Sequence, residues 1–258
     1  SIIGCFLALL VWSIVRDSPE TVTQGHKFQS PPKKSELKRL QQVCRNRQTW
    51  LIALYSFAIW APITAFAALW GIPFLVASYG LTTEAASIAS AMIWLGIGLG
   101  SPLMGWYSDK IGSRSKPLSL SALLGIISLT IIIYAPPLSL PWLYFTLFTF
   151  GLAASGQSLA FGVVKDNNTS CVVGTAIGFN NMAVVAGGAL FQPLIGILLY
   201  VNWSGVTHNG TPFYGIVDYQ KAFFVLPLCY VLALLVSQFL LRETYCKSQY
   251  SNESASAI

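Results

Sequence analysis

Residues 105–114 read GWYSDKIGSR, a short charged segment set between two long apolar stretches. The flanking stretches, residues 83–104 and 117–135, are each long enough to cross a bilayer, since a crossing helix needs about 20 apolar residues. The charged side chains between them must stay in water because charge inside hydrocarbon is costly. The segment is therefore predicted to be a tight hairpin on one aqueous side of a membrane.

The composition of the whole chain agrees with this prediction. Of the 258 residues, 54% are hydrophobic and only 9% are charged, and the mean hydropathy is +0.62. These values lie outside the range of soluble globular domains. The chain is predicted to be all-α, a polytopic transmembrane helical bundle with no room for a soluble catalytic domain.

The charges divide the chain into four parts. Residues 1–15 are apolar and end at Arg16, and they are predicted to be the end of a span whose beginning is missing, with a signal peptide as the alternative. Residues 16–48 form a basic connector, 49–242 a six-span bundle and 243–258 a tail. The six spans are predicted at residues 49–74, 83–104, 117–135, 140–163, 173–200 and 221–241.

The orientation in the membrane is predicted from the loop cations. With alternating sides, fourteen of the fifteen Lys and Arg residues fall on one side, and only Lys221 falls on the other. Because cytoplasmic loops carry the excess of Lys and Arg, the C-terminus is expected inside. The net charge of +6 follows from this topology, so no nucleic-acid partner is expected.

The cysteines and histidines predict neither a disulfide nor a metal site. Three cysteines fall on the cytoplasmic side and two within spans, so none is left for an oxidising compartment. His26 and His208 lie in loops, and no cluster has the spacing of a zinc site.

Part of the connector is predicted to be a surface helix. Residues 33–48 carry Leu37, Leu40 and Val43 or Cys44 at helical spacing, with Lys and Arg between them. Such an amphipathic helix lies in the membrane interface. Contact with anionic membrane lipid is one role for it, and setting the topology is the favoured one.

The hairpin resembles the loop signature of the major facilitator superfamily, Gly-x-x-x-Asp-Arg-x-Gly-Arg-Arg/Lys. Ser113 replaces the second Arg of the signature. The positions that match, with Lys110 standing for the first Arg, are Gly105, Asp109, Lys110, Gly112 and Arg114.

A second resemblance to this superfamily is the Pro-Glu-Thr that often follows its sixth and twelfth spans. Residues 19–21 read PET after the partial first span, and residues 242–244 read RET after the last span. The resemblance implies that the chain holds the end of span six, the central loop and spans seven to twelve. It would then be the C-terminal half of a transporter, with an N-terminal six-span half as its partner.

The hairpin residues suggest an inner gate. Gly105 and Gly112 are predicted to permit the close approach and unusual backbone angles of a short reversal. Asp109 is a negative charge at a helix end, which can bind the N-terminus of a facing helix. The resemblance implies that this contact joins the two halves on the inside. The alternative is that the cations of this segment only fix the topology.

The first complete span is too long for a simple crossing. Residues 49–81 contain no charge, and at 1.5 Å per residue a continuous helix would exceed the hydrocarbon thickness. Pro62, Gly71 and Pro73 are predicted to interrupt it, and interrupted helices mark gates or sites in transporters. The resemblance likewise implies a helix that bends to close the outer gate. A simple kink followed by a short re-entrant segment is the alternative.

Polar side chains inside spans are the candidates for the substrate pathway, because an unpaired one in hydrocarbon is costly. The resemblance implies that the first, second, fourth and fifth spans line this pathway. The third and sixth spans, in agreement, contain none of the polar candidates. For each candidate, packing or a hydrogen bond between helices is the alternative. The candidates are Tyr55, Trp60, Thr64, Trp94, Gln157, Asn180, Asn181 and Gln192.

The predicted function is secondary transport of a small-molecule solute by alternating access, in a bacterial inner membrane. Every acidic residue lies near or beyond the end of a span, so the titrating group of a proton- or ion-coupled symporter is expected in the other half. No nucleophile and base at a recognisable spacing and no phosphate-binding glycine loop is found. The chain is therefore not expected to be an enzyme or to hold a cofactor. A non-transporting half-length membrane partner or remnant is the alternative function.

Overall fold

The computed structural model describes residues 2–14, 36–208 and 210–249. The chain divides into two compact units, Ser1–Ser35 and Glu36–Ile258. The described part of the first unit is the helix α1 (Ile2–Ile14), which is apolar but shorter than the helices that could cross a membrane. The residues 19–21 that contribute to the resemblance lie outside the described residues.

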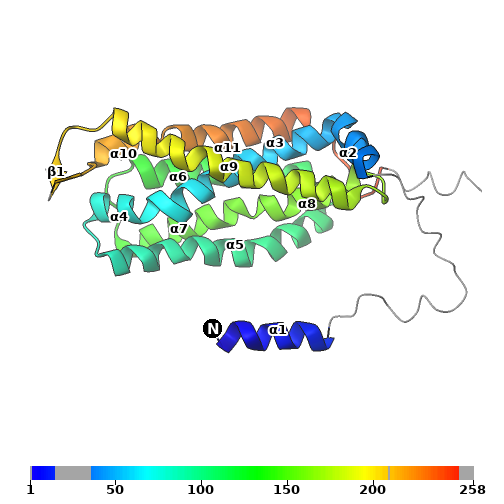
Figure 1. Ribbon diagram of the computed structural model, residues 1–258, viewed down its shortest axis with the longest axis horizontal. Helices are drawn as coiled ribbons and strands as arrows, with labels where there is room; N and C mark the ends of the chain where they lie inside the picture. Colours follow the sequence, from blue (N-terminus) through cyan, green and yellow to red (C-terminus); the bar gives the residue numbers. More distant parts are fainter. Residues whose placement is uncertain (1, 15–35, 209, 250–258) are drawn as a thin grey trace, which may run out of the picture. The chain divides into compact units, whose positions relative to one another are not determined.

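The second unit is a helical bundle with one short β-hairpin (Figure 1). In the hairpin, Thr207 pairs with Pro212 and His208 with Thr211. The elements in chain order are α2 (Glu36–Arg45), α3 (Arg47–Pro62), the π-helix η2 (Ile63–Trp70), α4 (Gly71–Tyr79), α5 (Thr83–Ile111), α6 (Ser115–Tyr134), α7 (Leu140–Ala154), α8 (Gly156–Asp166), α9 (Val173–Val201), β1 (Thr207–His208), β2 (Thr211–Pro212), α10 (Ile216–Phe223), α11 (Val225–Leu235) and the π-helix η3 (Val236–Leu240).

The prediction of an all-α polytopic bundle is confirmed. Within the described residues, six helical segments are long and apolar enough to cross a membrane. They match the six predicted spans in order, although most extend beyond the predicted bounds by several residues. The six spans run over Arg47–Tyr79, Thr83–Ile111, Ser115–Tyr134, Leu140–Asp166, Val173–Val201 and Ile216–Leu240.

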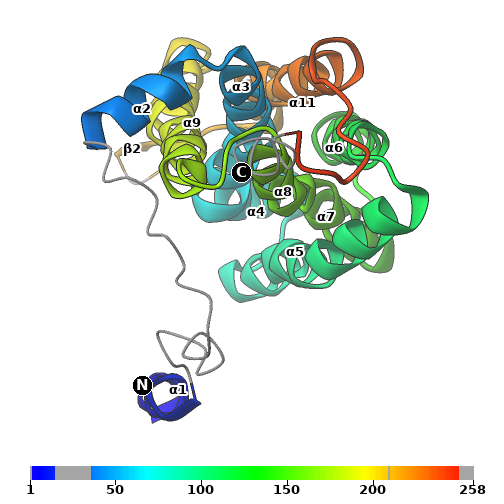
Figure 2. The ribbon, with the colours of Figure 1, turned by 90° about the vertical axis from the view of Figure 1, so that its right-hand side faces the viewer.

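The spans pack side by side in the end-on view of Figure 2. Following the contacts around the bundle, α5 packs on α7, α7 on α6, α6 on α11, α11 on α3 and α3 on α9. The α8 segment contacts α3, α5, α6 and α9 and so lies at the centre of this arrangement. Of the six spans, those formed by α5 and α9 have the smallest buried share.

The crossing of α5 and α7 is close because each helix presents a glycine to the other. A methyl group on Gly96 would overlap the carbonyl oxygen of Phe148, and one on Gly151 would overlap the carbonyl oxygen of Ile93. The two backbones can therefore approach to a distance that no larger residue at these positions would permit.

Two predictions about the start of the bundle are corrected. The surface helix is shorter than residues 33–48: α2 ends at Arg45, because Asn46 adopts an extended conformation and its side chain caps α3. The long first span is not interrupted by a break or a re-entrant segment. It stays helical from Arg47 to Tyr79, and the irregularity between Pro62 and Gly71 is a change to π-helix.

We call the end of the bundle at which α3 begins, α5 ends, α6 begins and α8 ends the basic end. Arg47, Arg114 and Lys165 lie there, and Arg242 follows the last span at the same end.

Candidate functional site

The segment that resembles the superfamily signature is mostly helix. Helix α5 continues through Ile111, so the reversal consists of Gly112, Ser113 and Arg114 only. Gly112 has a φ of +61°, in the left-handed region that favours glycine, as predicted. The same prediction for Gly105 is wrong: it lies inside α5, and a methyl group there would meet nothing within 4 Å. The last turn of α5 carries Lys110, and a cation near a helix C-terminus favours the helix.

Arg114 is the centre of a polar cluster at the basic end. Its Nε donates to Oδ2 of Asp166 at 3.1 Å, and its Nη1 donates to Oδ1 of Asp109 and to Oγ of Ser108, both at 3.0 Å. Thr244 Oγ1 also donates to Asp166 Oδ2, at 3.1 Å. We call these five residues the Arg114 cluster. They tie together α5, the start of α6, the end of α8 and the segment after η3.

The two carboxylates of the cluster differ in exposure. The side chain of Asp166 is 10% exposed and that of Arg114 14% exposed, whereas that of Asp109 is 67% exposed. The Arg114–Asp166 pair is therefore a largely buried, hydrogen-bonded ion pair, while Asp109 presents most of its surface outward. On the same exposed side, Lys110 Nζ lies 4.7 Å from the ring centroid of Trp106.

Glu243 joins the segment after η3 to the start of α6. Its carboxylate accepts hydrogen bonds from the backbone N–H groups of Arg114 at 2.8 Å and Ser115 at 3.0 Å, and from the hydroxyl of Ser113 at 2.6 Å. Free N–H groups at a helix N-terminus favour an anion. Partial burial opposes the charge on Glu243, but these donors and the N–H of Tyr245 outweigh it and lower the pKa to about 2.

Asp166, Glu243 and Thr244 were not predicted from the sequence to be site residues. Glu243 and Thr244 belong to the Arg-Glu-Thr that follows the last span and parallels the Pro-Glu-Thr at residues 19–21. The signal in the sequence for Glu243 was therefore that an acidic residue recurs at the same place after two spans, as Glu20 and as Glu243. For Asp166, the signal was an acid beside Lys165 at the end of a span on the same side as the hairpin.

Three of the eight pathway candidates form hydrogen bonds within the bundle, and a fourth is half-buried in it. Tyr55 is fully buried and its hydroxyl donates to the carbonyl oxygen of Leu118 at 3.0 Å, which ties α3 to α6. Gln192 Nε2 donates to the carbonyl oxygen of Thr64 at 2.9 Å and so ties α9 to η2. Thr64 donates to its own helix at Ala61, and Trp60 is half-buried in α3.

Two other candidates are buried amides with no hydrogen-bond partner among the described residues. Gln157 in α8 is 4% exposed and Asn180 in α9 is 0% exposed, and both the nitrogen and the oxygen of each side chain lack a partner there. The hydroxyl of Ser56, on α3, is in the same condition. Since α3, α8 and α9 contact one another, three neighbouring helices carry unpaired polar groups in the interior.

The last two candidates lie on open faces. Trp94 on α5 is about half exposed, and Asn181 on α9 is exposed. These are the two spans with the smallest buried share. Both side chains are therefore available to a partner that covers α5 and α9.

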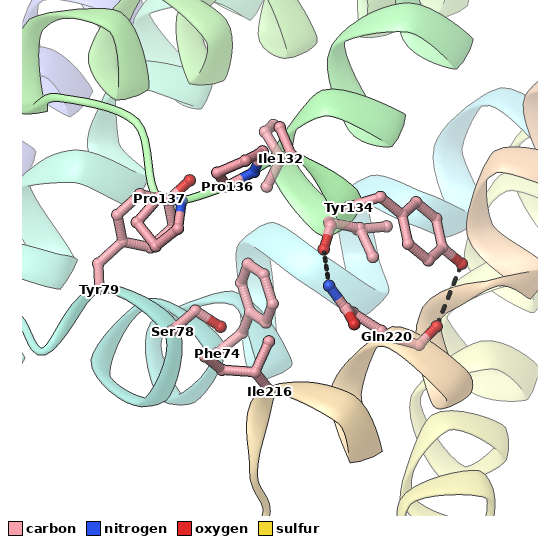
Figure 3. Close-up of a pocket in the computed structure, with 11 residues that line it drawn as sticks. Phe74, Ser78, Tyr79, Ile132, Tyr134, Pro136, Pro137, Ile216 and Gln220 are labelled. Atoms are coloured by element: carbon pink, nitrogen blue, oxygen red, sulfur yellow. Dashed lines mark hydrogen bonds between the residues drawn. The ribbon is translucent and has the colours of Figure 1, made fainter.

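A separate cavity of 240 Å³ lies at the end of the bundle opposite the basic end, between α4, the end of α6 and α10 (Figure 3). Phe74, Ser78 and Pro136 line it, and Gln220 closes one side through hydrogen bonds with Ile133 and Tyr134. None of the eight pathway candidates lines this cavity. Among the described residues, no group of three or more His, Cys, Asp or Glu side chains could hold a metal ion.

Comparison with known proteins assigns this architecture. A sequence model of the Major Facilitator Superfamily matches residues 1–191 and, in an overlapping match, residues 64–256. The chain belongs to the major facilitator superfamily. No curated protein sequence matched it. As a member of this superfamily with six apolar spans, the chain is an integral multi-pass membrane protein of a transporter family.

The two ion pairs of Arg114 are expected to differ in their contribution to stability. Asp166→Asn removes the less exposed of the two charged partners of Arg114 and leaves only the exposed Asp109. Its cost should therefore be the larger one, up to about 3–5 kcal/mol, the cost of a broken buried ion pair. Asp109→Asn removes an exposed pair, whose contribution is about 0–1 kcal/mol. Thermal unfolding of the two variants in the same detergent measures the difference. Equal losses of melting temperature would show that the burial of the pairs does not determine their strength.

The low pKa of Glu243 predicts a pH-dependent contribution to stability. Because the pKa falls from 4.5 to about 2 on folding, the stabilisation is complete above about pH 4.5 and is lost as the pH falls through about 2. Glu243→Gln should therefore lower the melting temperature at pH 7, and its difference from the unchanged chain should shrink between pH 4.5 and pH 2. Glu36→Gln, at an exposed position, is the control and should change little. A difference independent of pH would contradict the prediction.

Proposed function

We propose that the chain is the C-terminal half of a secondary transporter, which moves a small solute by alternating access together with an N-terminal six-span half. The observation that carries the proposal is the family match, because it extends over the whole bundle. The open faces of α5 and α9 support it, since a second half would cover apolar surface that this chain leaves unpacked. We further propose coupling to protons or another ion, with the titrating group in the other half.

We propose that the Arg114 cluster belongs to the inner gate and that the basic end faces the cytoplasm of a bacterial cell. The excess of cations at this end supports the orientation. Gly105 and Asp109 lie one helical turn apart on α5. Gly105 lies beside open space, and the side chain of Asp109 is exposed. Such a face suits the close approach of a helix N-terminus from the other half.

We assign Gln157 and Asn180 to the solute site. A buried polar group without a partner costs about 1–3 kcal/mol of folding free energy, and such a loss is tolerated at sites of function. Gln192 and Tyr55 have partners within the bundle, so they are assigned to packing. Trp94 and Asn181 are assigned to the surface between the halves.

The two-half proposal is tested by reconstitution into liposomes. The chain alone should take up no solute from a panel of amino acids, sugars and organic acids under an imposed proton or sodium gradient. The same chain joined to its N-terminal half should take up at least one of them. Uptake by the chain alone as a monomer would overturn the proposal.

The solute-site assignment predicts opposite effects on stability and transport. Gln157→Met and Asn180→Leu replace unpaired amides by apolar groups of similar size, so each should raise the melting temperature while lowering uptake by the joined transporter about 10-fold or more. Gln192→Met is the matched control, because it removes a made hydrogen bond and should lower the melting temperature. Retained uptake in both of the first two variants would remove Gln157 and Asn180 from the site.

A further inference from the structure

An apolar groove runs between α3 and α9 next to the basic end. Its volume is 280 Å³, and every residue that lines it is apolar. The side chains that form most of its wall are Trp50, Leu54 and Phe57 from α3 and Phe179, Met182 and Ala186 from α9. Trp50 and Met182 are more than half exposed, so the groove is open to its surroundings. In a membrane-spanning bundle, an open apolar groove at this level meets hydrocarbon.

Trp50 connects the groove to the corner between α2 and α3. Its ring packs edge-on against Phe179 with 4.8 Å between ring centroids. Its Nε1 donates to the carbonyl oxygen of Cys44, near the end of α2, at 2.9 Å. A tryptophan with an apolar body and a bonded N–H is typical of the level at which hydrocarbon gives way to headgroups.

Two arginines flank this corner. Arg45 is the last residue of α2 and Arg47 the first residue of α3. Both are exposed, and neither forms an ion pair with a carboxylate of the described residues, in contrast to Arg39, which pairs with Glu36. The positive end of the α3 helix dipole also lies at this corner and adds to the positive potential.

Hydrogen bonds of Asn46 hold the corner in place. Asn46 Nδ2 donates to the carbonyl oxygen of Asn167 at 2.7 Å, and Asn46 Oδ1 accepts from the N–H of Gln48 at 3.0 Å. On α2 itself, Val43 is buried while Leu37 and Leu40 are exposed. A short helix with cations and exposed leucines lies in the interface of a bilayer, which places both arginines at headgroup level.

We propose that this corner and groove bind one anionic phospholipid of the adjacent leaflet. Its headgroup phosphate lies between Arg45 and Arg47, and one acyl chain lies along the groove beside Trp50 and Phe179. Two cations that pair with no carboxylate of the described residues, at the mouth of a wholly apolar groove, match a ligand with negative charge at one end and hydrocarbon at the other. A second copy of the chain would supply apolar surface to the groove but would leave the two arginines unpaired. The proposal requires only that the chain spans a membrane, so it is independent of transport.

The test uses native mass spectrometry of the full chain with an equimolar mixture of dioleoyl phosphatidylglycerol and dioleoyl phosphatidylcholine. The unchanged chain should retain phosphatidylglycerol in preference, about 10-fold or more for two cations at the surface. Arg45→Gln combined with Arg47→Gln should bring the preference near one. The control combines Lys165→Gln with Lys247→Gln, which removes the same amount of charge from exposed positions outside the corner. This control should keep the preference for phosphatidylglycerol.

The role of the groove is tested without changing charge. Ala186→Phe fills the groove and should reduce the retention of both lipids, whereas Ala189→Phe, at an exposed position outside the groove, should not. Glycerol phosphate, the headgroup without acyl chains, should fail to compete. The proposal is overturned if the control double variant loses the preference as fully as the corner variant. It is also overturned if glycerol phosphate competes as well as the lipid, if Ala186→Phe has no effect, or if the chain dimerises through this face without lipid.

Discussion

The basic end of the bundle depends on the hydrogen bonds and ion pairs of the largely buried Arg114. The Arg114 side chain donates hydrogen bonds to Ser108 and Asp109 of α5 and to Asp166 of α8. Its backbone N–H donates to Glu243, which follows the last span. Removing a cation from water is expensive unless several charged or polar groups meet it with good geometry. The ends of four segments therefore have to be brought to one place, which fixes their relative heights along the bundle.

The spans could be predicted from the sequence because hydrocarbon imposes a length and an apolar composition on every crossing helix. Their ends could not be placed as well. The predicted ten-residue hairpin proved to be three residues, because helix α5 continues through Asp109 and Lys110 into water. A charged residue is compatible with a helix once the helix has left the hydrocarbon, so charge alone marks the membrane boundary and not the helix end.

The polar contacts were less predictable than the helices. Asp166 meets a residue 52 positions away and Glu243 meets one 129 positions away, and no local pattern specifies such pairings. Likewise, Gln157, Asn180 and Gln192 look equivalent as amides in apolar spans. Only packing shows that Gln192 reaches the carbonyl oxygen of Thr64 while the other two remain without partners in the described structure. The register of one helix against another is set by side-chain fit over the whole interface, which is a property of pairs of segments.

The π-helical segment η2 combines an irregular backbone with polar contacts to a neighbouring helix. Pro62 removes one backbone donor, and the wider helix that follows places Thr64 beside Gly188 and Gln192 of α9. Trp70, at the other end of η2, donates to the carbonyl oxygen of Gln192 at 3.1 Å. The irregular segment is thus held at both ends by one residue of the neighbouring helix, and π-helical turns are common at functional sites. The irregular segment is therefore fixed against α9 by two hydrogen bonds at Gln192, one from near each end of η2, where the regular α-helical pattern is absent.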